Sequence, residues 1–198
     1  MGVEKRMADR CNTIRLYSFQ TDVVYQVLKR DGVCYSKEEY VRKKYKESAK
    51  VFINAYGWVV KEAQHIVPKP EGAEYPYWAF TDLYNVDQTG DGHVLTLDVP
   101  IGEAILFDMF DWTKIMQMHY IGENESEEAA FSEELKNMGM NEFQIMTSNF
   151  YPEQKARIQE SWKRLFGHQQ AIEAGDNSGV HSVQAGLWCI KGEWIVKE

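Results

Sequence analysis

The sequence is poor in cysteine and has no long apolar run. Its three cysteines, Cys11, Cys34 and Cys189, are widely spaced and form no CxxC motif. An odd, scattered set of this kind excludes a disulfide framework and is typical of a reducing compartment. No stretch reaches the roughly 20 apolar residues of a membrane-spanning helix, and no signal-peptide pattern follows the charged N-terminus. We therefore expect a cytoplasmic protein that has no membrane partner.

An excess of positive charge is also missing. The chain has 22 Lys and Arg residues against 30 Asp and Glu residues, which gives a formal net charge of -8 at pH 7. Nonspecific binding to nucleic acid depends on clustered Lys and Arg residues, so this balance disfavours broad nucleic-acid binding. The run RKKYK at 42–46 is a local exception, and it is typical of the solvated face of a helix.

The common catalytic motifs are absent. The sequence contains no GxSxG, no HExxH and no glycine-rich phosphate loop. The segment DQTGDGHVLTLD at 87–98 has the acidic spacing of a calcium loop, but a strand-like run follows it where such a loop requires a helix. An Asp-Gly turn explains the same residues, so we expect no metal site.

The composition is that of a folded chain. Apolar residues make up 44% of it and aromatic residues 13%, which is enough for a hydrophobic core at this length. We interpret residues 1–12 as a disordered leader or tag remnant and 13–198 as a single α+β domain.

The apolar periodicity predicts how the domain is built. Alternation over 14–19 indicates a first strand, and the segment from Thr21 to Gly32 has the cap and stop signals of a helix. Helical spacing continues over about 37–66 until Pro68. The other expected elements are strands at 93–100 and 104–108 paired as a hairpin, helices at about 112–120 and 152–166, a short strand at 143–147, and a strand pair or one bent strand within 181–196. The acidic run ENESEE at 123–128 is expected to lead into a further helix that ends near Gly139. We expect a mixed or antiparallel sheet, made of the first strand, the 93–108 hairpin and the C-terminal strands, packed against the long helix.

The stretch EYPYWAFTDLYN at 74–85 concentrates aromatic rings between two turns. Tyr75, Tyr77 and Trp78 can form a stacking platform for a planar ligand, or they can be large residues at the rim of the core. A third interpretation is an exposed patch that binds a partner protein.

Two carboxylates follow the predicted strand at 104–108. Asp108 and Asp111 stand where this strand gives way to a helix. An N-cap with a charged neighbour is the simpler interpretation, and an acid/base pair is the alternative.

Several segments together resemble an uncharacterised bacterial family known only as a domain of unknown function. They are LYSFQT, EYPYWAF, VLTLDVPIGEAILFDMFDWTKIM and VQAGLWCIKGEWI, and the likeness extends from about residue 14 to 196. The resemblance implies one domain and a bacterial cytosolic setting, with no activity attached.

A looser similarity is to the ADP-ribosyltransferase fold, which would make NAD a cofactor. In that likeness Arg15 or Tyr17 matches a first-strand position, and the rings of Tyr77 and Trp78 flank the nicotinamide. The last strand departs from the pattern, because it offers Gln184 where a catalytic glutamate is needed to stabilise developing positive charge.

The sequence therefore predicts a cleft for a small-molecule or nucleotide-like ligand, with a noncatalytic protein-interaction module as the alternative. The candidate ligand-binding residues are Arg15, Tyr17, Gln20, Tyr77, Trp78, Asp108, Asp111, Trp112 and Gln184.

Overall fold

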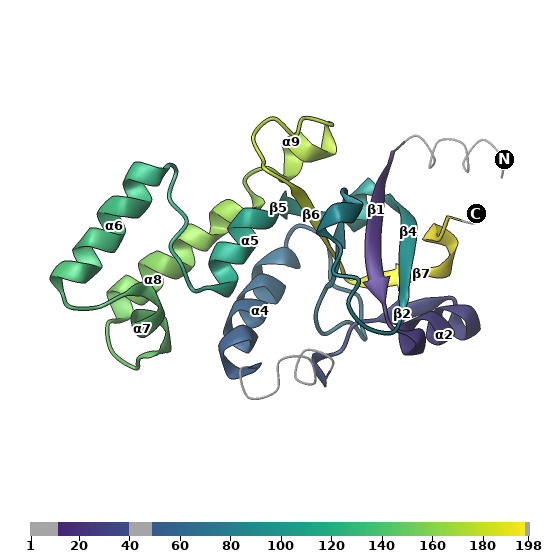
Figure 1. Ribbon diagram of the computed structural model, residues 1–198, viewed down its shortest axis with the longest axis horizontal. Coiled ribbons are helices and arrows are strands. Elements are labelled where there is room, and N and C mark those ends of the chain that lie inside the picture. Colours follow the sequence, from purple (N-terminus) through teal and green to yellow (C-terminus); the bar gives the residue numbers. More distant parts are fainter. Residues whose placement is uncertain (1–11, 40–48, 197–198) are drawn as a thin grey trace.

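A curved five-stranded antiparallel sheet stands at the centre of the computed structural model, which describes residues 12–39 and 49–196 (Figure 1). The strand order is β4-β1-β3-β6-β5. Its strands are β1 (Thr13–Gln20), β3 (Tyr77–Phe80), β4 (His93–Pro100), β5 (Ile105–Asp108) and β6 (Val183–Leu187). A second sheet pairs β2 (Val33–Tyr35) with β7 (Cys189–Lys191). The α+β class and the antiparallel sheet predicted from the sequence are confirmed. The proposed leader falls on residues 1–11, which lie outside the described part of the chain, and on Asn12.

The first strand and helix form where the sequence predicts them, although the Thr21 side chain makes no capping hydrogen bond. β1 alternates inward and outward side chains along its length. α2 (Asp22–Asp31) begins after Thr21 and ends at Gly32, whose φ of 75° is the left-handed conformation that terminates many helices. Val24 and Leu28, one turn apart, are the buried residues of this helix.

The expected 93–108 hairpin is wrong. β4 pairs with β1 along its whole length, whereas β5 pairs with β6, so these two strands form opposite edges of the sheet. Only the 3-10 turn η3 (Ile101–Glu103) and Ala104 separate them. Such a connection reaches at most about 18 Å. Four strand spacings in a flat sheet add up to about 19 Å. β4 and β5 also run in the same direction, so the connection joins the end of one strand to the start of the other and would have to span more than this lateral distance. The sheet must therefore curl to bring these two points together.

Two hydrophobic clusters cover the two faces of the sheet. One face packs against α4 (Ala49–Ala63) and α5 (Met109–Met116), and we call it the helix face. The opposite face packs against α2, the small sheet and α9 (Gln169–Glu173). The predicted packing of the sheet on a long helix is confirmed for α4, which contributes Ala55, Tyr56 and Val59 to the first cluster. The first part of the helix predicted at 37–66 lies at 40–48, outside the described residues.

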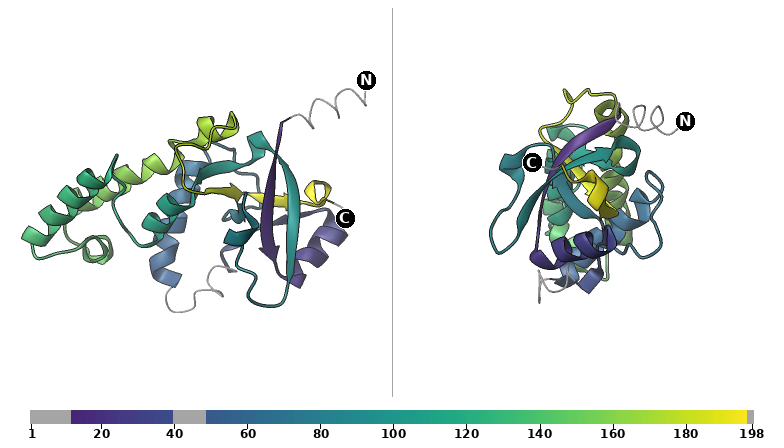
Figure 2. Two further views of the ribbon diagram at one scale, coloured as in Figure 1. Left: turned by 45° about the horizontal axis from the view of Figure 1, so that its top comes forward. Right: turned by 90° about the vertical axis from the view of Figure 1, so that its right-hand side faces the viewer.

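A helical arm extends from the helix face away from the sheet (Figures 1 and 2). It contains α6 (Glu125–Asn137), α7 (Glu142–Thr147), α8 (Pro152–Ser161) and the 3-10 helix η4 (Trp162–Phe166). The strand predicted at 143–147 is wrong, because this segment is α7. A capping box between Asn141 and Gln144 starts the helix, and Ile145 and Met146 anchor it in the core.

The end of the described chain contributes to both sheets. After β6 the chain continues through Trp188 into β7, so the predicted strand pair is divided between the two sheets. The 3-10 helix η5 (Gly192–Trp194) follows, and the last residues then pass along β4. There Ile195 forms a bridge with Leu97, and the Val196 N–H donates to the carbonyl of Thr96 at 2.9 Å.

Candidate functional site

Four of the predicted ligand-binding residues share the helix face of the sheet. Because side chains alternate along a strand and directly paired residues point the same way, the register places Arg15, Tyr17, Trp78 and Gln184 on this face. The helices cover the face over β5 and β6, where its side chains are buried, and leave it more open over β1 and β4. The site candidates therefore lie along the boundary between a covered and an open half.

Gln184 lies in a cross-strand row of rings. The register pairs Tyr17 with Phe80, Phe80 with Gln184, and Gln184 with Phe107. Phe107 is completely buried, whereas Phe80 and Tyr17 are partly exposed. The row thus runs from the core toward solvent, with one amide between aromatic neighbours.

The side-chain amide of Gln184 lacks a hydrogen bond to any described residue, although Gln184 is only 3% exposed. The two other buried glutamines of the described chain do form such bonds: Gln20 donates to Ser18 Oγ at 2.8 Å, and Gln169 donates to the Ala104 carbonyl at 3.1 Å. Every fully buried side-chain nitrogen and oxygen among the described residues has a partner. The polar atoms of the Gln184 side chain therefore keep some contact with solvent.

The tryptophans of the predicted site form part of the core behind this row. The Trp78 indole lies 4.7 Å from the Trp112 ring and donates its N–H to the Tyr56 hydroxyl at 2.7 Å. Trp112 is 6% exposed and also packs edge-on against Tyr56. Gly186 on β6 lies beside the Trp78 ring, where a Cβ atom would be 3.4 Å away, at van der Waals contact. Both rings pack in the hydrophobic cluster of the helix face. Trp112 is buried, whereas Trp78 is partly exposed.

Two of the predicted residues lie on the opposite face, which corrects the expected cleft. Tyr77 precedes Trp78 on β3, and its hydroxyl is 3.2 Å from Cys34 Sγ in the second hydrophobic cluster. Gln20 also points to this side. Because consecutive residues of a strand point in opposite directions, Tyr77 and Trp78 cannot flank one ligand ring.

Arg15 is already paired with a carboxylate. Its guanidinium donates two hydrogen bonds to Asp98 on β4, at 2.5 and 3.0 Å, and both side chains are about half exposed. Arg15 also lines a pocket of about 390 Å³ beside the start of β1 and the end of α9. An exposed pair of this kind contributes little to stability and can exchange partners.

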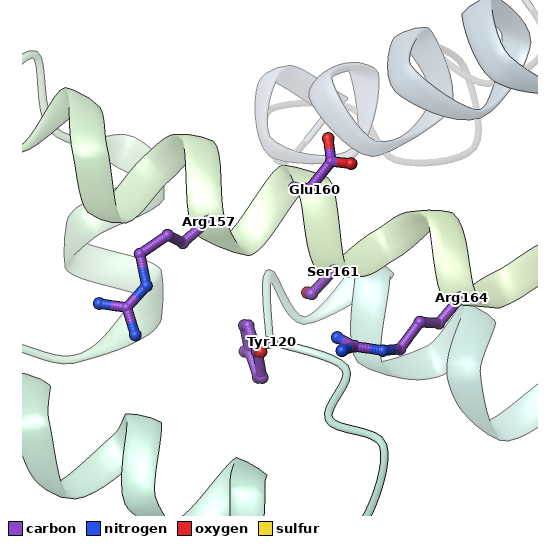
Figure 3. Close-up of a pocket in the computed structure, with 5 residues that line it drawn as sticks. All are labelled: Tyr120, Arg157, Glu160, Ser161 and Arg164. Atoms are coloured by element: carbon purple, nitrogen blue, oxygen red, sulfur yellow. The ribbon is translucent and has the colours of Figure 1, made fainter.

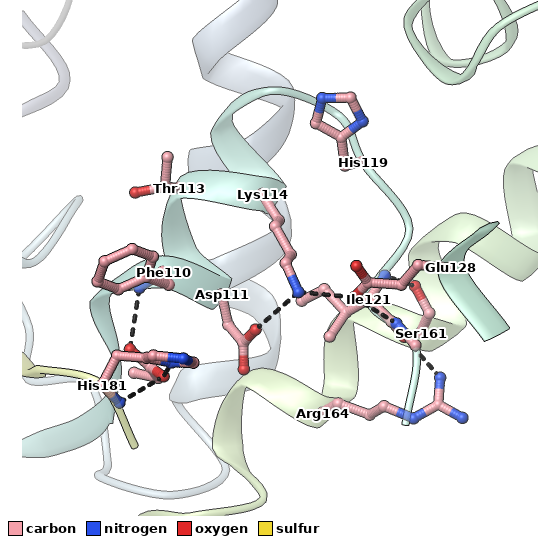
Figure 4. Close-up of polar contacts among 12 residues, drawn as sticks. Phe110, Asp111, Thr113, Lys114, His119, Ile121, Glu128, Ser161, Arg164 and His181 are labelled. Carbon is pink, nitrogen blue, oxygen red and sulfur yellow. Dashed lines mark hydrogen bonds and ion pairs between the residues drawn. The ribbon is translucent and has the colours of Figure 1, made fainter. Parts of the chain in front are cut away.

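Asp108 connects the start of α5 to the loop before β6. Its carboxylate accepts from the backbone N–H of Phe110 at 3.0 Å and of His181 at 2.9 Å, and it lies 2.9 Å from the His181 Nδ1 atom (Figure 4). Burial raises the pKa of Asp108, but the backbone N–H donors lower that pKa by more, so its net shift is downward. The N-cap interpretation is confirmed.

Asp111 lies one turn away in a different environment. Burial raises its pKa, opposed by the Lys114 ammonium 3.7 Å away. Lys114 in turn donates to Glu128 at 2.6 Å, and the three side chains form a connected polar network (Figure 4). The opposite pKa shifts of Asp108 and Asp111 would suit an acid/base pair, but Asp108 already accepts several hydrogen bonds from the protein.

Sequence reasoning missed the direct neighbours of Gln184. Phe80 and Phe107 belong to separate segments, and only the pairing of β3, β6 and β5 brings them together. For Phe80 a signal exists, because it follows Trp78 by two positions in YWAF and must share its face.

The described residues contain neither a candidate metal site nor a candidate membrane-spanning helix. No group of three His, Cys, Asp or Glu side chains there is placed to hold a metal ion. None of the described helices is long and apolar enough to cross a membrane.

Comparison with known proteins gives a family and no activity. No curated protein and no solved structure matches the chain, so the likeness to ADP-ribosyltransferases has no support from either. One family model does match, described as a domain of unknown function (DUF3841), and it extends over residues 15–196, from the third residue of β1 onward. The chain therefore belongs to this DUF3841 family.

Proposed function

We propose that the chain binds a nucleotide-like small molecule on the helix face, with Gln184 reading the edge of a planar base. The observation that supports the proposal is the amide of Gln184, which is enclosed by its neighbours and yet hydrogen-bonded to none of the described residues. A carboxamide offers one acceptor and two donors, and it can pair with a base edge through two hydrogen bonds.

The neighbours of Gln184 suit the same ligand. Phe80 on the adjacent strand β3 and Tyr17 on β1, one strand further, are partly exposed aromatic residues against which a base can stack. Arg15 lies on the same face nearer its open edge and carries a guanidinium that can exchange Asp98 for a phosphate. The arrangement supports binding rather than ribosyl transfer, because Gln184 cannot supply the negative charge which that reaction needs.

The test is a titration with ATP, ADP, NAD and adenosine, followed by calorimetry and by the melting temperature. A ligand that binds the folded chain raises the melting temperature as its concentration increases. Substitution Gln184→Leu keeps the size of the side chain and removes its donors and acceptor. We expect Gln184→Leu to weaken binding by about 5- to 150-fold, the usual discrimination of a bidentate base contact.

The matched control is Gln20→Leu, a buried glutamine on the opposite face. It should leave the ligand affinity unchanged, even where it lowers stability by removing the bond to Ser18 Oγ. Gln184→Leu should not destabilise the chain, because no hydrogen bond to the described residues is lost. The proposal fails if no nucleotide binds, or if Gln184→Leu binds as tightly as the unchanged chain.

A second candidate is a surface for a partner protein, and the exposure of several apolar side chains favours it. Tyr84 is 93% exposed, Leu83 43% and Phe110 50%. They surround the loop before β6, since Asn85 donates to Ser182 Oγ at 2.7 Å and the Phe110 ring lies 4.9 Å from that of His181. Exposed apolar clusters commonly mark interaction surfaces. A negative result with every nucleotide would leave this surface as the better candidate.

A further inference from the structure

A pocket of about 380 Å³ opens in the helical arm, on the face of α8 and η4 that is turned toward the loop after α5. Its lining residues are Tyr120, Arg157, Glu160, Ser161 and Arg164. Figure 3 shows the two guanidiniums on either side of the Tyr120 ring, with Ser161 between their helical positions. The arginines are seven residues apart, which is about two helical turns, so both side chains leave the helix on one side.

The wall formed by the loop is held in place by side chains. The Ile121 N–H donates to Ser161 Oγ at 3.0 Å, and its carbonyl accepts from Arg164 Nη1 at 2.7 Å. The Trp162 indole donates to the His119 carbonyl at 2.6 Å, and the Tyr120 N–H donates to Glu142 at 3.0 Å. The pocket is therefore preformed, and a ligand would not have to order its wall.

The two guanidiniums differ in how fully they are paired. Arg157 donates to both carboxylate oxygens of Glu134, at 2.5 and 3.0 Å. Arg164 makes one short bond, to the Ile121 carbonyl, while its Nη2 atom lies 3.4 Å from Glu123 and 3.5 Å from Glu127. Charge-assisted hydrogen bonds usually measure about 2.7–2.9 Å. Arg164 therefore retains donors that its carboxylate neighbours do not saturate.

The carboxylates near Arg164 either accept hydrogen bonds from other groups or are exposed and can move away. The Glu127 oxygens accept from the Tyr120 hydroxyl at 2.5 Å and from the Glu123 N–H at 2.6 Å. The Glu123 side chain is 74% exposed and makes only the long contact with Arg164 among the described residues. Glu160 lines the pocket but pairs with Lys163 at 2.7 Å. An incoming anion would displace Glu123 and would lie beside the Glu127 carboxylate, which stays in place 3.5 Å from Arg164 Nη2.

We propose that this pocket binds an oxyanion, the phosphate group of a small ligand, with Arg164 as the main donor. The fork of Arg164 supplies N–H groups toward two oxygens of the anion, and Arg157 and Tyr120 form the sides of the pocket. The site is separate from the one proposed on the helix face.

The test is calorimetry with pyrophosphate, inorganic phosphate and succinate at constant ionic strength, on the full chain. We expect the two phosphate compounds to bind and succinate to bind at least ten times more weakly. Substitution Glu123→Gln removes the competing charge at an exposed position, so it should tighten phosphate binding several-fold. Arg164→Gln should weaken binding by about tenfold or more, as expected when one partner of a charge-assisted contact is removed.

Two controls make the result decisive. Arg30→Gln alters an exposed arginine of α2 that is paired with Asp31, and it should change nothing. Gln184→Leu should also leave pyrophosphate binding unchanged, which separates this site from the base-binding proposal. Should Arg164→Gln fail to fold, Glu123→Gln still decides. The proposal is overturned if the unchanged chain and Glu123→Gln give no binding heat, if succinate binds as tightly as phosphate, or if Glu123→Gln does not tighten binding.

Discussion

The carboxylate of Asp108 should be a main support of the junction between the start of α5 and the loop before β6, and Asp108→Asn tests this. One oxygen, Oδ2, accepts from both the His181 N–H and the His181 ring nitrogen, and Oδ1 accepts from Phe110 and, at 3.4 Å, from Ser182. An amide at position 108 presents N–H groups to some of these donors and leaves them unpaired. A hydrogen bond to a charged group contributes about 1.5–3 kcal/mol. We expect the free energy of unfolding to fall by about 2–3 kcal/mol at pH 7, since the remaining oxygen keeps one side of the contacts.

The contribution of Asp108 to the free energy of unfolding should also change with pH in a predictable direction. Because the pKa of Asp108 is lower in the folded chain than in the unfolded one, its contribution is fully present above the unfolded pKa of about 4. The contribution is lost as pH falls through the folded pKa, so the difference between Asp108→Asn and the unchanged chain should shrink in acid. Urea unfolding at pH 7 and pH 3.5, followed by tryptophan fluorescence, measures both differences.

The control for this prediction is His181→Ala, which keeps the carboxylate and the backbone donor. The His181 side chain is 75% exposed, so its loss should cost less than about 1 kcal/mol. A loss of under 0.5 kcal/mol for Asp108→Asn at pH 7, or an equal loss at both pH values, would refute the assigned role.

Two further predictions concern stability. Trp78→Ala should lower the free energy of unfolding by about 3–4 kcal/mol in urea titration, near the lower end of core truncations because the indole is partly exposed, and Trp78→Phe should cost clearly less. Equal losses would show that the packing of an aromatic ring at this position does not account for the stability. The hydrogen bond with Glu142 raises the pKa of His119, so this pair stabilises the fold below the unfolded histidine pKa of about 6.5 and loses its effect as pH rises through the folded value. Glu142→Gln should flatten the melting temperature between pH 6 and 8.5, and an unchanged His119 titration in NMR spectra would contradict the pairing.

The elements whose ends carry their own signals could be predicted from the sequence. Thr21 and Gly32 mark both ends of α2, and the alternation over 93–100 specifies β4. Local signals also misled at α7, where the β-branched and aromatic residues suggested a strand. In the structure this segment is a helix, which a capping box at Asn141 starts and in which Ile145 is buried.

Strand pairing was beyond the reach of the sequence. β4 and β5 are close neighbours along the chain, which favours a hairpin between them. In the structure β4 pairs with β1 instead, and β5 pairs with β6. The pairing of distant segments depends on the whole apolar pattern of both faces, which no single window contains.

In the candidate site, too, local features could be predicted from the sequence and contacts between distant segments could not. The period of two along YWAF already separates Tyr77 from Trp78, so their opposite directions could have been anticipated. The row around Gln184 could not, because its neighbours Phe80 and Phe107, and Tyr17 beyond Phe80, lie on three different strands. The residue types were recognisable in advance, and only the register showed which of them meet.

The path of the last described residues along β4 has a consequence for the behaviour of the chain in concentrated solution. β4 is an outer strand, and its free N–H and C=O groups would offer a template to the same strand of a neighbouring molecule. The bridge at Ile195 and the bond from Val196 occupy part of that template. By covering part of this edge, these few residues should reduce intermolecular strand addition.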